Sequence, residues 1–233
     1  MEVTLTIYRY DPEKDKKPYY KTYKVEVDLM DRIVDCLNKV KWEQDGTLTF
    51  RKSCAHGVCG SDAIRIDGEN GLACQTLVKD LKGGKAVIEP LLEFPVIKDL
   101  VVDLDPFFKN LEKIKPYFIN NSPPPDKERY QSNEDRDRID DSLKCILCGS
   151  CTSSCPSYWY NKDYLGPAAL VKAHRFILDS RDEGKEERIS IVNDRNGLWR
   201  CHTILNCNEV CPKEINITQC ISELKRFVLA SKL

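Results

Sequence analysis

The sequence predicts an α+β chain of two domains, the first built mainly of strands and the second of helices. Apolar residues alternate with polar ones in the N-terminal part, whereas they recur at helical spacing in the C-terminal part. The run Asn120–Pro125, which can be neither helix nor central strand, and a very polar stretch separate the two patterns. We therefore expect one domain over residues 1–105 and another over 106–233, with residues 106–140 as a surface-draped connection.

The N-terminal domain is expected to be a small sheet crossed by one helix. Period-two alternation predicts strands around Val3–Ile7 and Tyr23–Val27, joined by a long loop. Apolar residues from Met30 to Val40 have helical spacing. Further short strands are expected at Leu48–Phe50, Ala63–Ile66 and Ala86–Ile88, with a turn at Asp67–Gly71. The β-grasp arrangement fits this inventory best.

The C-terminal domain is expected to be all-α. One helix should begin at Gly166-Pro167 and continue through Ile177. Another should be capped by Asn216 and bury a face that runs from Ile217 to Val228. Cysteine groups lie just before both helices, so we expect the helix ends to hold the loops that contain them.

Cysteine usage indicates metal or redox chemistry. Twelve cysteines occur in three groups, at residues 54–74, 145–155 and 201–220, with Cys36 apart. No secretory or transit signal is visible, and no window approaches the roughly 18 apolar residues of a membrane span. The chain should therefore stay where it is made, and in a reducing cytoplasm such clusters more often bind metal than form disulfides. The net charge of −1 and the absence of a basic stripe do not predict nucleic-acid binding.

The second cysteine group is the full run of a bacterial-type ferredoxin. Residues 145–156 read C-x2-C-x2-C-x3-C-P. Three closely spaced thiolates bind three corners of one cubane, and the fourth cysteine binds the other cluster. This spacing is highly specific for iron–sulfur clusters.

The partner run contains one gap. Counted back from Cys211, cysteines are due ten, seven and four residues earlier, and the middle place is Ile204. We therefore predict a [4Fe–4S] cluster and a [3Fe–4S] cluster. The ligands of the first are Cys145, Cys148, Cys151 and Cys211, and those of the second are Cys155, Cys201 and Cys207.

The gap at Ile204 has an electrostatic consequence. One thiolate fewer means less negative charge around the iron, so the three-iron centre should have the higher potential and electrons should finish there. Zinc is the alternative reading of paired C-x2-C groups. It is disfavoured because zinc takes its ligands in fours, whereas seven cysteines are interleaved here.

The first cysteine group resembles a plant-type [2Fe–2S] loop with one substitution. Cys54 and Cys59 have the C-x4-C spacing, and the third cysteine of the plant-type pattern is replaced by Asp62. We expect ligands at Cys54, Cys59, Asp62 and Cys74, because a carboxylate is a competent if harder iron ligand. The alternative is that Asp62 only hydrogen-bonds the loop and Cys36 is the ligand. His56 is expected to lie on the surface rather than bind iron.

Taken together, the motifs resemble the iron–sulfur subunit of succinate dehydrogenase (succinate:quinone oxidoreductase, respiratory complex II). The resemblance covers nearly the whole chain and is strongest at Arg51–Asp62, Cys145–Trp159, Gly166–Ala168, His174–Asp182 and Cys201–Lys213. It implies that a flavoprotein subunit with FAD oxidises succinate. Electrons then pass through [2Fe–2S], [4Fe–4S] and [3Fe–4S] centres to quinone at a membrane-anchor subunit, which in many members is a cytochrome b with haem b.

The resemblance also implies a quinone site beside the three-iron centre. Its residues would be Pro156, Trp159, Tyr160, His202 and Ile204. The family usually has a second tryptophan, whose indole N–H faces the quinone, where this chain has Tyr160, so a phenol would donate from a different place. The alternative interpretation, equally favoured, is that Tyr160 belongs to an aromatic patch that packs on the anchor subunit and has no role in quinone binding. His202 is as readily a hydrogen-bond donor to a cluster sulfide.

Several other functions are compatible with parts of the pattern. Fumarate reductase has the same fold with reversed flux, but Asp62 and Trp159 favour the dehydrogenase. A subunit of another oxidoreductase would not explain residues 156–182, and a zinc-stabilised binding module would be colourless. The resemblance implies a peripheral position on the cytoplasmic face of a prokaryotic inner membrane, held by the anchor subunits.

Overall fold

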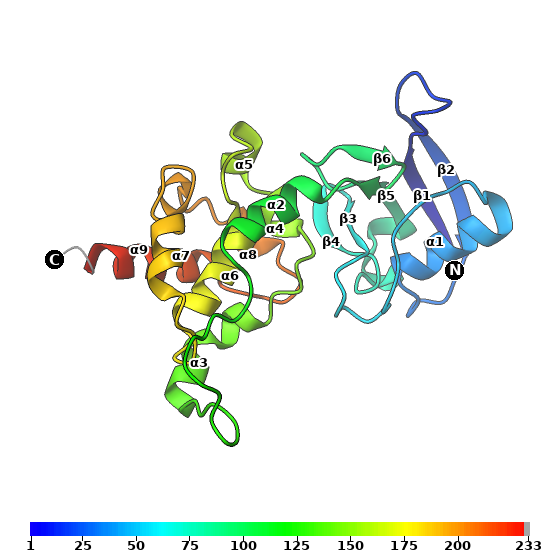
Figure 1. Ribbon diagram of the computed structural model, residues 1–233. Coiled ribbons are helices and arrows are strands. Elements are labelled where there is room, and N and C mark those ends of the chain that lie inside the picture. Colours follow the sequence, from blue (N-terminus) through cyan, green and yellow to red (C-terminus); the bar gives the residue numbers. More distant parts are fainter. Residues whose placement is uncertain (231–233) are drawn as a thin grey trace. The chain divides into compact units, whose positions relative to one another are not determined.

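The computed structural model describes residues 1–230, which form two compact units. The first contains residues 1–104 and 146–154; the second contains residues 105–145 and continues from residue 155. The sequence-based division after residue 105 instead assigns residues 146–154 to the second domain, and those boundaries stay a prediction. Figure 1 labels the helices of both units and the strands β1 to β6.

The first unit is built on a five-stranded mixed sheet. Its strands are β1 (Glu2–Arg9), β2 (Tyr19–Glu26), β3 (Ala63–Ile66), β4 (Glu69–Leu72) and β5 (Lys85–Glu89). Their order is β2-β1-β5-β3-β4, with β1 parallel to β5 and the other pairs antiparallel. The alternation in β1 buries Val3, Leu5 and Ile7 completely, as the period-two pattern predicts.

Helix α1 (Ile33–Lys39) packs into the core of this sheet and continues as a π-helical turn over Val40–Gln44. Three-residue 3₁₀ turns follow at Val78–Asp80 and Lys82–Gly84. Met30, expected on the buried face of this helix, lies outside it and is exposed. The helix and the mixed sheet together form the expected β-grasp arrangement (Figure 1).

Two local predictions in this unit are wrong. The turn expected over residues 67–71 is shorter than predicted. Asp67 and Gly68 both adopt positive φ and form a two-residue hairpin turn. Strand β4 begins directly after this turn, at Glu69. Residues 48–50 are not a strand. The backbone of Thr49 pairs instead with the side chain of Asp99 and the amide of Leu100.

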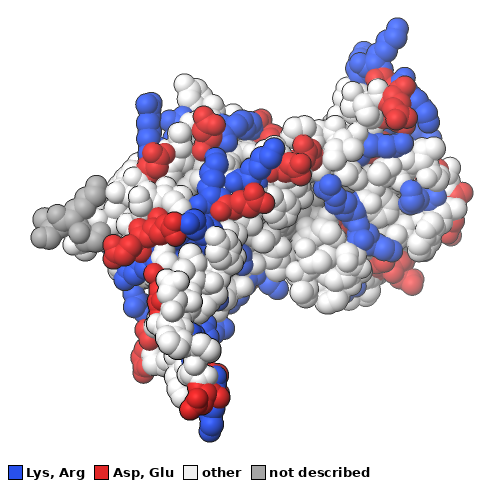
Figure 2. Space-filling model, in the orientation of Figure 1, with Lys and Arg blue, Asp and Glu red and all other residues white. Residues whose placement is uncertain are grey.

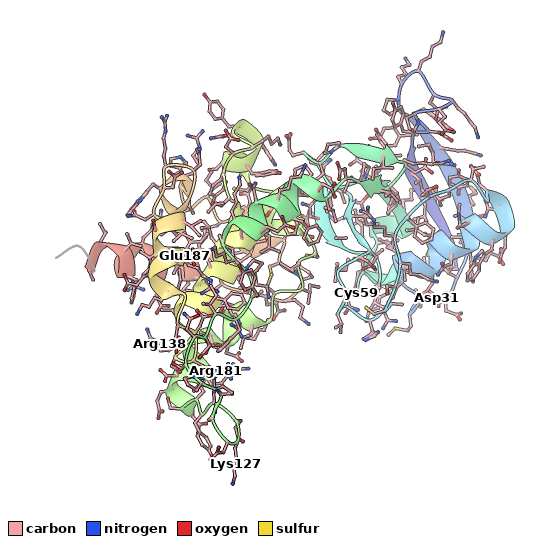
Figure 3. All side chains as sticks on the ribbon, viewed as in Figure 1. Asp31, Cys59, Lys127, Arg138, Arg181 and Glu187 are labelled. Atoms are coloured by element: carbon pink, nitrogen blue, oxygen red, sulfur yellow. The ribbon has the colours of Figure 1, made fainter. Side chains whose placement is uncertain are left out.

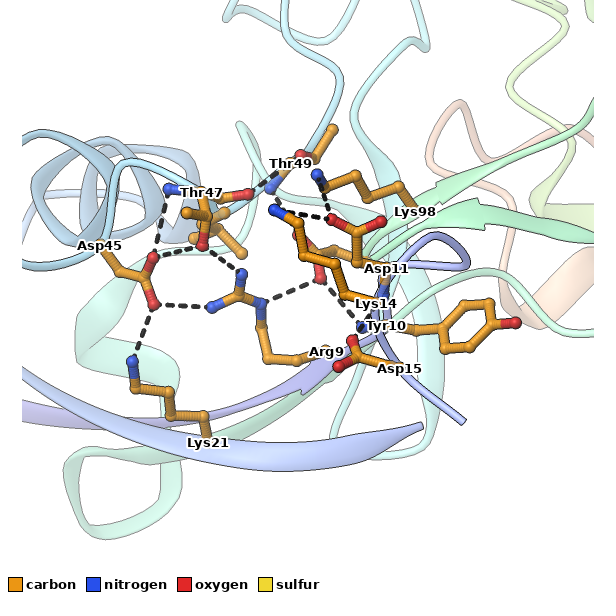
Figure 4. Close-up of polar contacts among 12 residues, drawn as sticks. Arg9, Tyr10, Asp11, Lys14, Asp15, Lys21, Asp45, Thr47, Thr49 and Lys98 are labelled. Carbon is orange, nitrogen blue, oxygen red and sulfur yellow. Dashed lines mark hydrogen bonds and ion pairs between the residues drawn. The ribbon is translucent and has the colours of Figure 1, made fainter. Parts of the chain in front are cut away.

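A buried polar network fixes the segment that leads to the first cysteine group. Arg9 is 4% exposed and donates hydrogen bonds to Asp45 (2.8 Å) and Asp99 (2.9 Å). Asp99 lies between β6 (Val96–Lys98) and β7 (Val101–Val102) and also accepts the amide of Thr49 at 2.8 Å (Figure 4). Since Thr49 precedes Cys54 by five residues, this network anchors the start of the cluster-binding loop.

The second unit is helical. Its helices are α2 (Asp105–Lys113), α3 (Asn133–Leu143), α5 (Pro156–Tyr160), α6 (Pro167–Ile177), α7 (Lys185–Val192), α8 (Asn206–Glu209) and α9 (Ile217–Ala230), with a 3₁₀ turn at Leu198–Arg200. Helix α4 (Ser150–Ser153) belongs to the first unit. The expected helices starting at Pro167 and after Asn216 are present, and Asn216 Oδ1 caps α9 by accepting the amide of Gln219 at 3.1 Å.

Residues 106–140 are not wholly a draped connection, which corrects the sequence-based expectation. Helix α2 buries Phe107 and Leu111, and α3 is capped by Ser132, whose hydroxyl accepts the amide of Asp135 at 3.1 Å. A strongly polar helix with a good cap and an acidic first turn has no apolar pattern to reveal it. Within residues 1–230 no helix is long and apolar enough to span a membrane.

Charges are mixed on the surface of each unit. On the face shown in Figure 2, basic and acidic side chains are interspersed, including on the connection between β1 and β2. The ion pair between Arg188 and Asp182 is fully buried: both side chains are 0% exposed, and their charged atoms lie 2.5 Å apart. Arg188 also donates to the carbonyls of Lys115 and Tyr117 and so holds the connecting segment against the second unit.

Candidate functional site

The loop before β3 surrounds the sulfur of Cys54 with backbone donors. The amides of His56, Val58 and Cys59 donate to Cys54 Sγ at 3.3–3.4 Å. These hydrogen bonds lower the pKa of the Cys54 thiol to about 6, and the hydrogen bond from the His56 amide has the largest effect. Cys59, labelled in Figure 3, is exposed on the same loop and its sulfur accepts the amide of Cys54 at 3.5 Å. Stabilised thiolates of this kind are what an iron ligand requires.

Asp62 is buried beside Cys74, as a ligand pair requires. It is 4% exposed, and its Oδ2 accepts the amide of Cys74 at 2.6 Å. Its Oδ1 has no hydrogen-bond partner among the described residues. An isolated buried carboxylate oxygen is costly unless a cation binds it. Burial and the neighbouring Asp62 raise the pKa of Cys74 to about 11, so a cation at this position would stabilise both groups.

The position of Cys36 in the structure does not support it as an alternative iron ligand. Cys36 is fully buried within α1, among the apolar residues of the sheet core. Burial raises the pKa of its thiol to about 11, which is typical of an inert structural cysteine. The donor set Cys54, Cys59, Asp62 and Cys74 therefore fits a two-iron cluster, and His56 is exposed as expected.

The four cysteines proposed for the [4Fe–4S] cluster fall in both units. Cys148 and Cys151 belong to the first unit, whereas Cys145 and Cys211 belong to the second. The run turns sharply, because Leu147 and Gly149 both adopt positive φ. Helix α4 starts directly after Gly149 and contains Cys151. This ligand set stays a prediction from its spacing.

The three cysteines proposed for the [3Fe–4S] cluster line one hollow of the second unit. Cys155 precedes α5, Cys201 follows the turn Leu198–Arg200, and Cys207 lies on α8. All three line the hollow, together with Ile204. The positive φ of Thr203 and Leu205, on either side of Ile204, turns this short segment around the hollow.

The electrostatics of this hollow favour a cation. Burial raises the pKa of Cys155, and it raises that of Cys207 to about 12. The thiols of Cys155 and Cys201 raise the pKa of Cys207 further, which places the three groups within electrostatic range of one another. Three thiolates that disfavour one another's charge are stabilised when iron ions bind between them. The residues present therefore fit a cluster with three protein ligands.

The residues implied for quinone binding lie around the same hollow or on the adjoining helix. Pro156, His202 and Ile204 line the hollow, and Ile204 is 48% exposed. Trp159 and Tyr160 lie on α5 but do not line the hollow. The side chain of Tyr160 is 86% exposed, and the centre of its ring lies 5.2 Å from the guanidinium of Arg200. An aromatic ring so exposed is available to a ligand or a partner subunit.

Some neighbours of these sites gave no sequence signal. Lys225 donates to the backbone carbonyl of Cys201, and Lys172 donates to that of Cys145. A lysine on a helix is usually a solvated charge, so neither was singled out. Within residues 1–230, no three His, Cys, Asp or Glu side chains are grouped for a single metal ion. Ligands that each bind a different iron of a cluster are more widely separated than ligands of one ion.

Comparison with known families agrees with the division into a two-iron and a dicluster region. Residues 4–109 match the 2Fe-2S iron-sulfur cluster binding domain. Residues 141–215 match the 4Fe-4S dicluster domain.

Relatives match over nearly the full length of the chain. The succinate dehydrogenase iron-sulfur subunit of Paracoccus denitrificans is 48% identical over 225 residues, which cover 96% of this chain and 86% of the relative. The subunit of the same name from Coxiella burnetii is 43% identical over 230 residues and 97% of both chains. A chain of the Mycobacterium smegmatis Sdh1 complex in the apo form has a TM-score of 0.86 at 27% identity, covering 99% of this chain and 97% of that one.

Proposed function

The chain belongs to the family of succinate dehydrogenase iron–sulfur subunits, and from this premise we propose how its own residues conduct electrons from succinate to quinone. Its cofactors are iron–sulfur clusters of the [2Fe–2S], [4Fe–4S] and [3Fe–4S] types. When bound, these clusters accept and release single electrons. The chain is thus an electron-transfer subunit of the enzyme complex, while succinate itself is oxidised on another subunit.

One observation supports this function above all others: the hollow lined by Cys155, Cys201 and Cys207 with Ile204 where a fourth thiolate would complete a cubane. Three thiolates hold three irons, and an apolar side chain withholds the fourth ligand. In this proposal the centre has a higher potential than the four-iron centre and is the last in the chain. Its partly exposed surroundings suit transfer to a small acceptor.

We propose ligands for each cluster in turn. Cys54, Cys59, Asp62 and Cys74 hold the two-iron cluster, with the loop amides stabilising the sulfur charge. Cys145, Cys148, Cys151 and Cys211 hold the four-iron cluster. Cys155, Cys201 and Cys207 hold the three-iron cluster, and the quinone binds near Pro156, Trp159, Tyr160, His202 and Ile204.

Partner subunits and location follow from the family. We propose a flavoprotein subunit with FAD as electron donor, and one or more anchor subunits, in some members a cytochrome b with haem b, beside the quinone. The exposed Trp159 and Tyr160 would meet the anchor or the quinone itself. The chain would then be held peripherally on the cytoplasmic face of the inner membrane. The names of the relatives support succinate oxidation over the reverse flux of a fumarate reductase.

The test is whether succinate reduces the clusters of the assembled complex. The purified complex is mixed with succinate and frozen for EPR, and a parallel sample receives malonate, which lacks the CH2–CH2 bond that is oxidised. Succinate should reduce the three-iron centre and part of the two-iron centre, and added quinone should reoxidise them. Clusters that dithionite reduces but succinate does not would contradict the proposed function.

A further inference from the structure

The sulfur of Cys74, a proposed ligand of the two-iron cluster, has a side-chain hydrogen-bond donor beside it. Gln75 Nε2 lies 3.8 Å from Cys74 Sγ, within hydrogen-bond range of a sulfur acceptor, and 2.9 Å from the backbone oxygen of Cys74. A side-chain amide nitrogen has two N–H groups, so it can donate to both atoms at once. The inference below rests on the proposed function, because it needs Cys74 to bind iron.

The two acceptors determine which end of the Gln75 amide faces Cys74. A carbonyl oxygen only accepts hydrogen bonds, and the sulfur of an iron-bound thiolate has no proton to donate. The amide oxygen of Gln75 would be repelled by both atoms if it took the place of the nitrogen. The nitrogen therefore faces Cys74, and the ligand sulfur receives an N–H donor.

The backbone of Gln75 is fixed by a tight turn that directly follows β4. The amide of Gln75 donates to the carbonyl of Leu72, the last residue of that strand, at 3.0 Å. Helix α1 is bound to the same turn, because the amide of Ile33, its first residue, donates to the carbonyl of Thr76 at 3.0 Å. The side chain of Gln75 therefore starts from a rigid part of the first unit.

The amide end of Gln75 also packs against the loop that contains Cys54 and Cys59. A Cβ on Gly57 would lie 2.8 Å from Cδ of Gln75 and 3.0 Å from its Nε2. Gly57 has a φ of +75° and, having no side chain, leaves room for this amide. Although Gln75 as a residue is exposed, its amide is thus confined between Gly57 and Cys74.

A hydrogen bond to a ligand sulfur favours the reduced state of a cluster. Reduction adds one electron, which comes from the flavoprotein and leaves to the four-iron cluster, and it neither forms nor breaks a bond. Part of the added negative charge lies on the sulfur atoms, and an N–H donor stabilises it more in the reduced than in the oxidised state. We propose that Gln75 raises the reduction potential of the two-iron cluster by donating a hydrogen bond to the sulfur of its ligand Cys74.

The experiment is an EPR potentiometric titration of the two-iron centre in the purified complex. Gln75→Met keeps an unbranched side chain of similar length beside Gly57 but removes both N–H donors. At the wild-type midpoint, the ratio of reduced to oxidised centre should fall about threefold in this variant, which corresponds to ~28 mV at ~59 mV per tenfold change. Gln75→Lys keeps a donor and should titrate at or above the wild-type potential.

Thr76→Val is the matched control. Thr76 is the next residue in the same turn, and its hydroxyl donates to the carbonyl of Leu72 at 3.2 Å rather than to a sulfur. Valine keeps the shape of the side chain and removes this donor, so the two-iron centre should titrate as in the wild type. A shift equal to that of Gln75→Met would overturn the proposal, because the effect would then come from the turn.

A merely structural role of Gln75 would give a different result. If the side chain only packs on Gly57, Gln75→Met would lower the iron content or the thermal midpoint of the complex while the potential stays unchanged, and the proposal would be overturned. If Gln75→Met does not retain the cluster, Gln75→Asn decides, since it keeps an amide but is one methylene too short. Its potential should fall below that of the wild type, and a wild-type potential would overturn the proposal.

Failure of the proposed function would look different from failure of this inference. A wild-type complex that shows no two-iron signal after reduction would refute the cluster assignment on which the inference rests. A wild-type complex with that signal, together with an unshifted potential in Gln75→Met, would overturn only the role of Gln75.

Discussion

Gly60 and Cys148 approach so closely that a Cβ on the glycine would lie 2.8 Å from Cβ of the cysteine. Gly60 closes the loop that holds Cys54 and Cys59, and Cys148 is a proposed ligand of the four-iron cluster. Both residues belong to the first unit, which also contains the core against which Cys148 packs. The loop of the first cysteine group and a proposed ligand of the four-iron cluster are therefore in direct contact, which would favour electron transfer between the two proposed clusters.

Substitution of Gly60 should disturb both of these clusters. Gly60 adopts a φ of +68°, and an alanine there would meet the backbone and Cβ of Cys148, which cannot move aside like a flexible side chain. Gly83 has a φ of +63° with open space around it and is the matched control. Both Gly→Ala changes should cost about 1–2 kcal/mol for the left-handed conformation. Only Gly60→Ala should also reduce the EPR intensity of the reduced two-iron and four-iron centres; equal spectra for the two variants would contradict the close contact.

Asp62 should be required for stable binding of the two-iron cluster. Asp62→Asn keeps an oxygen that can accept the amide of Cys74 but replaces the carboxylate by an amide, which is a poor iron ligand. We expect cluster retention, measured by iron content and visible absorbance, to fall about 10-fold to 100-fold. Asp62→Cys should restore binding with four thiolates.

The control for Asp62 is a second loop aspartate with a similar hydrogen bond. Asp67 is exposed and its Oδ1 accepts the amide of Val87 at 2.7 Å. Asp67→Asn should leave the cluster intact, as should Cys36→Ser. Loss of the cluster in Cys36→Ser, with retention in Asp62→Asn, would reverse the ligand assignment.

His174 should make the stability of the second unit depend on pH. It is 2% exposed and its ring contacts Ser142 and Glu223 at 3.2 Å each. Burial lowers its pKa below 6.5; Arg138 adds to this, whereas Glu223 and Asp141 oppose it. The folded state therefore resists protonation, and as pH falls below 6.5 the unfolded state binds the proton first. Stability is fully present above that value and is lost on acidification, by at most about 1.4 kcal/mol per pH unit.

The measurement is the apparent thermal midpoint of unfolding. It is recorded for the wild type and for His174→Gln at a series of pH values from above 6.5 into mild acid. The wild type should lose stability relative to the variant as pH falls, since the glutamine does not titrate. Parallel pH profiles for the two proteins would show that His174 is not the responsible group.

Ile204 should determine the type of the last cluster. Ile204→Cys supplies the missing thiolate at the position where the partner run has one, so a four-iron cluster should form. Conversion to a four-iron centre should lower the potential at this position and slow quinone reduction. Ile204→Val, which adds no ligand, should keep the three-iron signal. Iron content and EPR of the oxidised complex distinguish the two variants.

The sequence predicted the elements that have a strong periodic pattern. The hairpin of β1 and β2, the strands β3 and β5, and the helices α6 and α9 were all expected, because each buries one regular face. Helix α3 was missed because its residues are almost all polar and its cap at Ser132 is the main local signal. Thr49 was misassigned because its partner is the distant carboxylate of Asp99, which no local pattern reveals.

The site was predictable where spacing determines chemistry. The cysteines proposed for the three-iron site and the gap at Ile204 follow from the ferredoxin pattern, and all four residues line one hollow. The unpaired oxygen of Asp62, the contact of Gly60 with Cys148 and the hydrogen bond of Lys225 depend on tertiary packing. Contacts of this kind join residues far apart in the sequence and leave no periodic trace.

The most direct test of the central claim is an EPR spectrum of the air-oxidised protein before and after dithionite. Oxidised two-iron and four-iron centres have even electron counts and are silent, whereas an oxidised three-iron centre has half-integer spin. We predict a signal in the oxidised sample that disappears on reduction while signals of the two other centres appear. An oxidised sample that retains its iron but shows no such signal would contradict the three-thiolate site around Ile204.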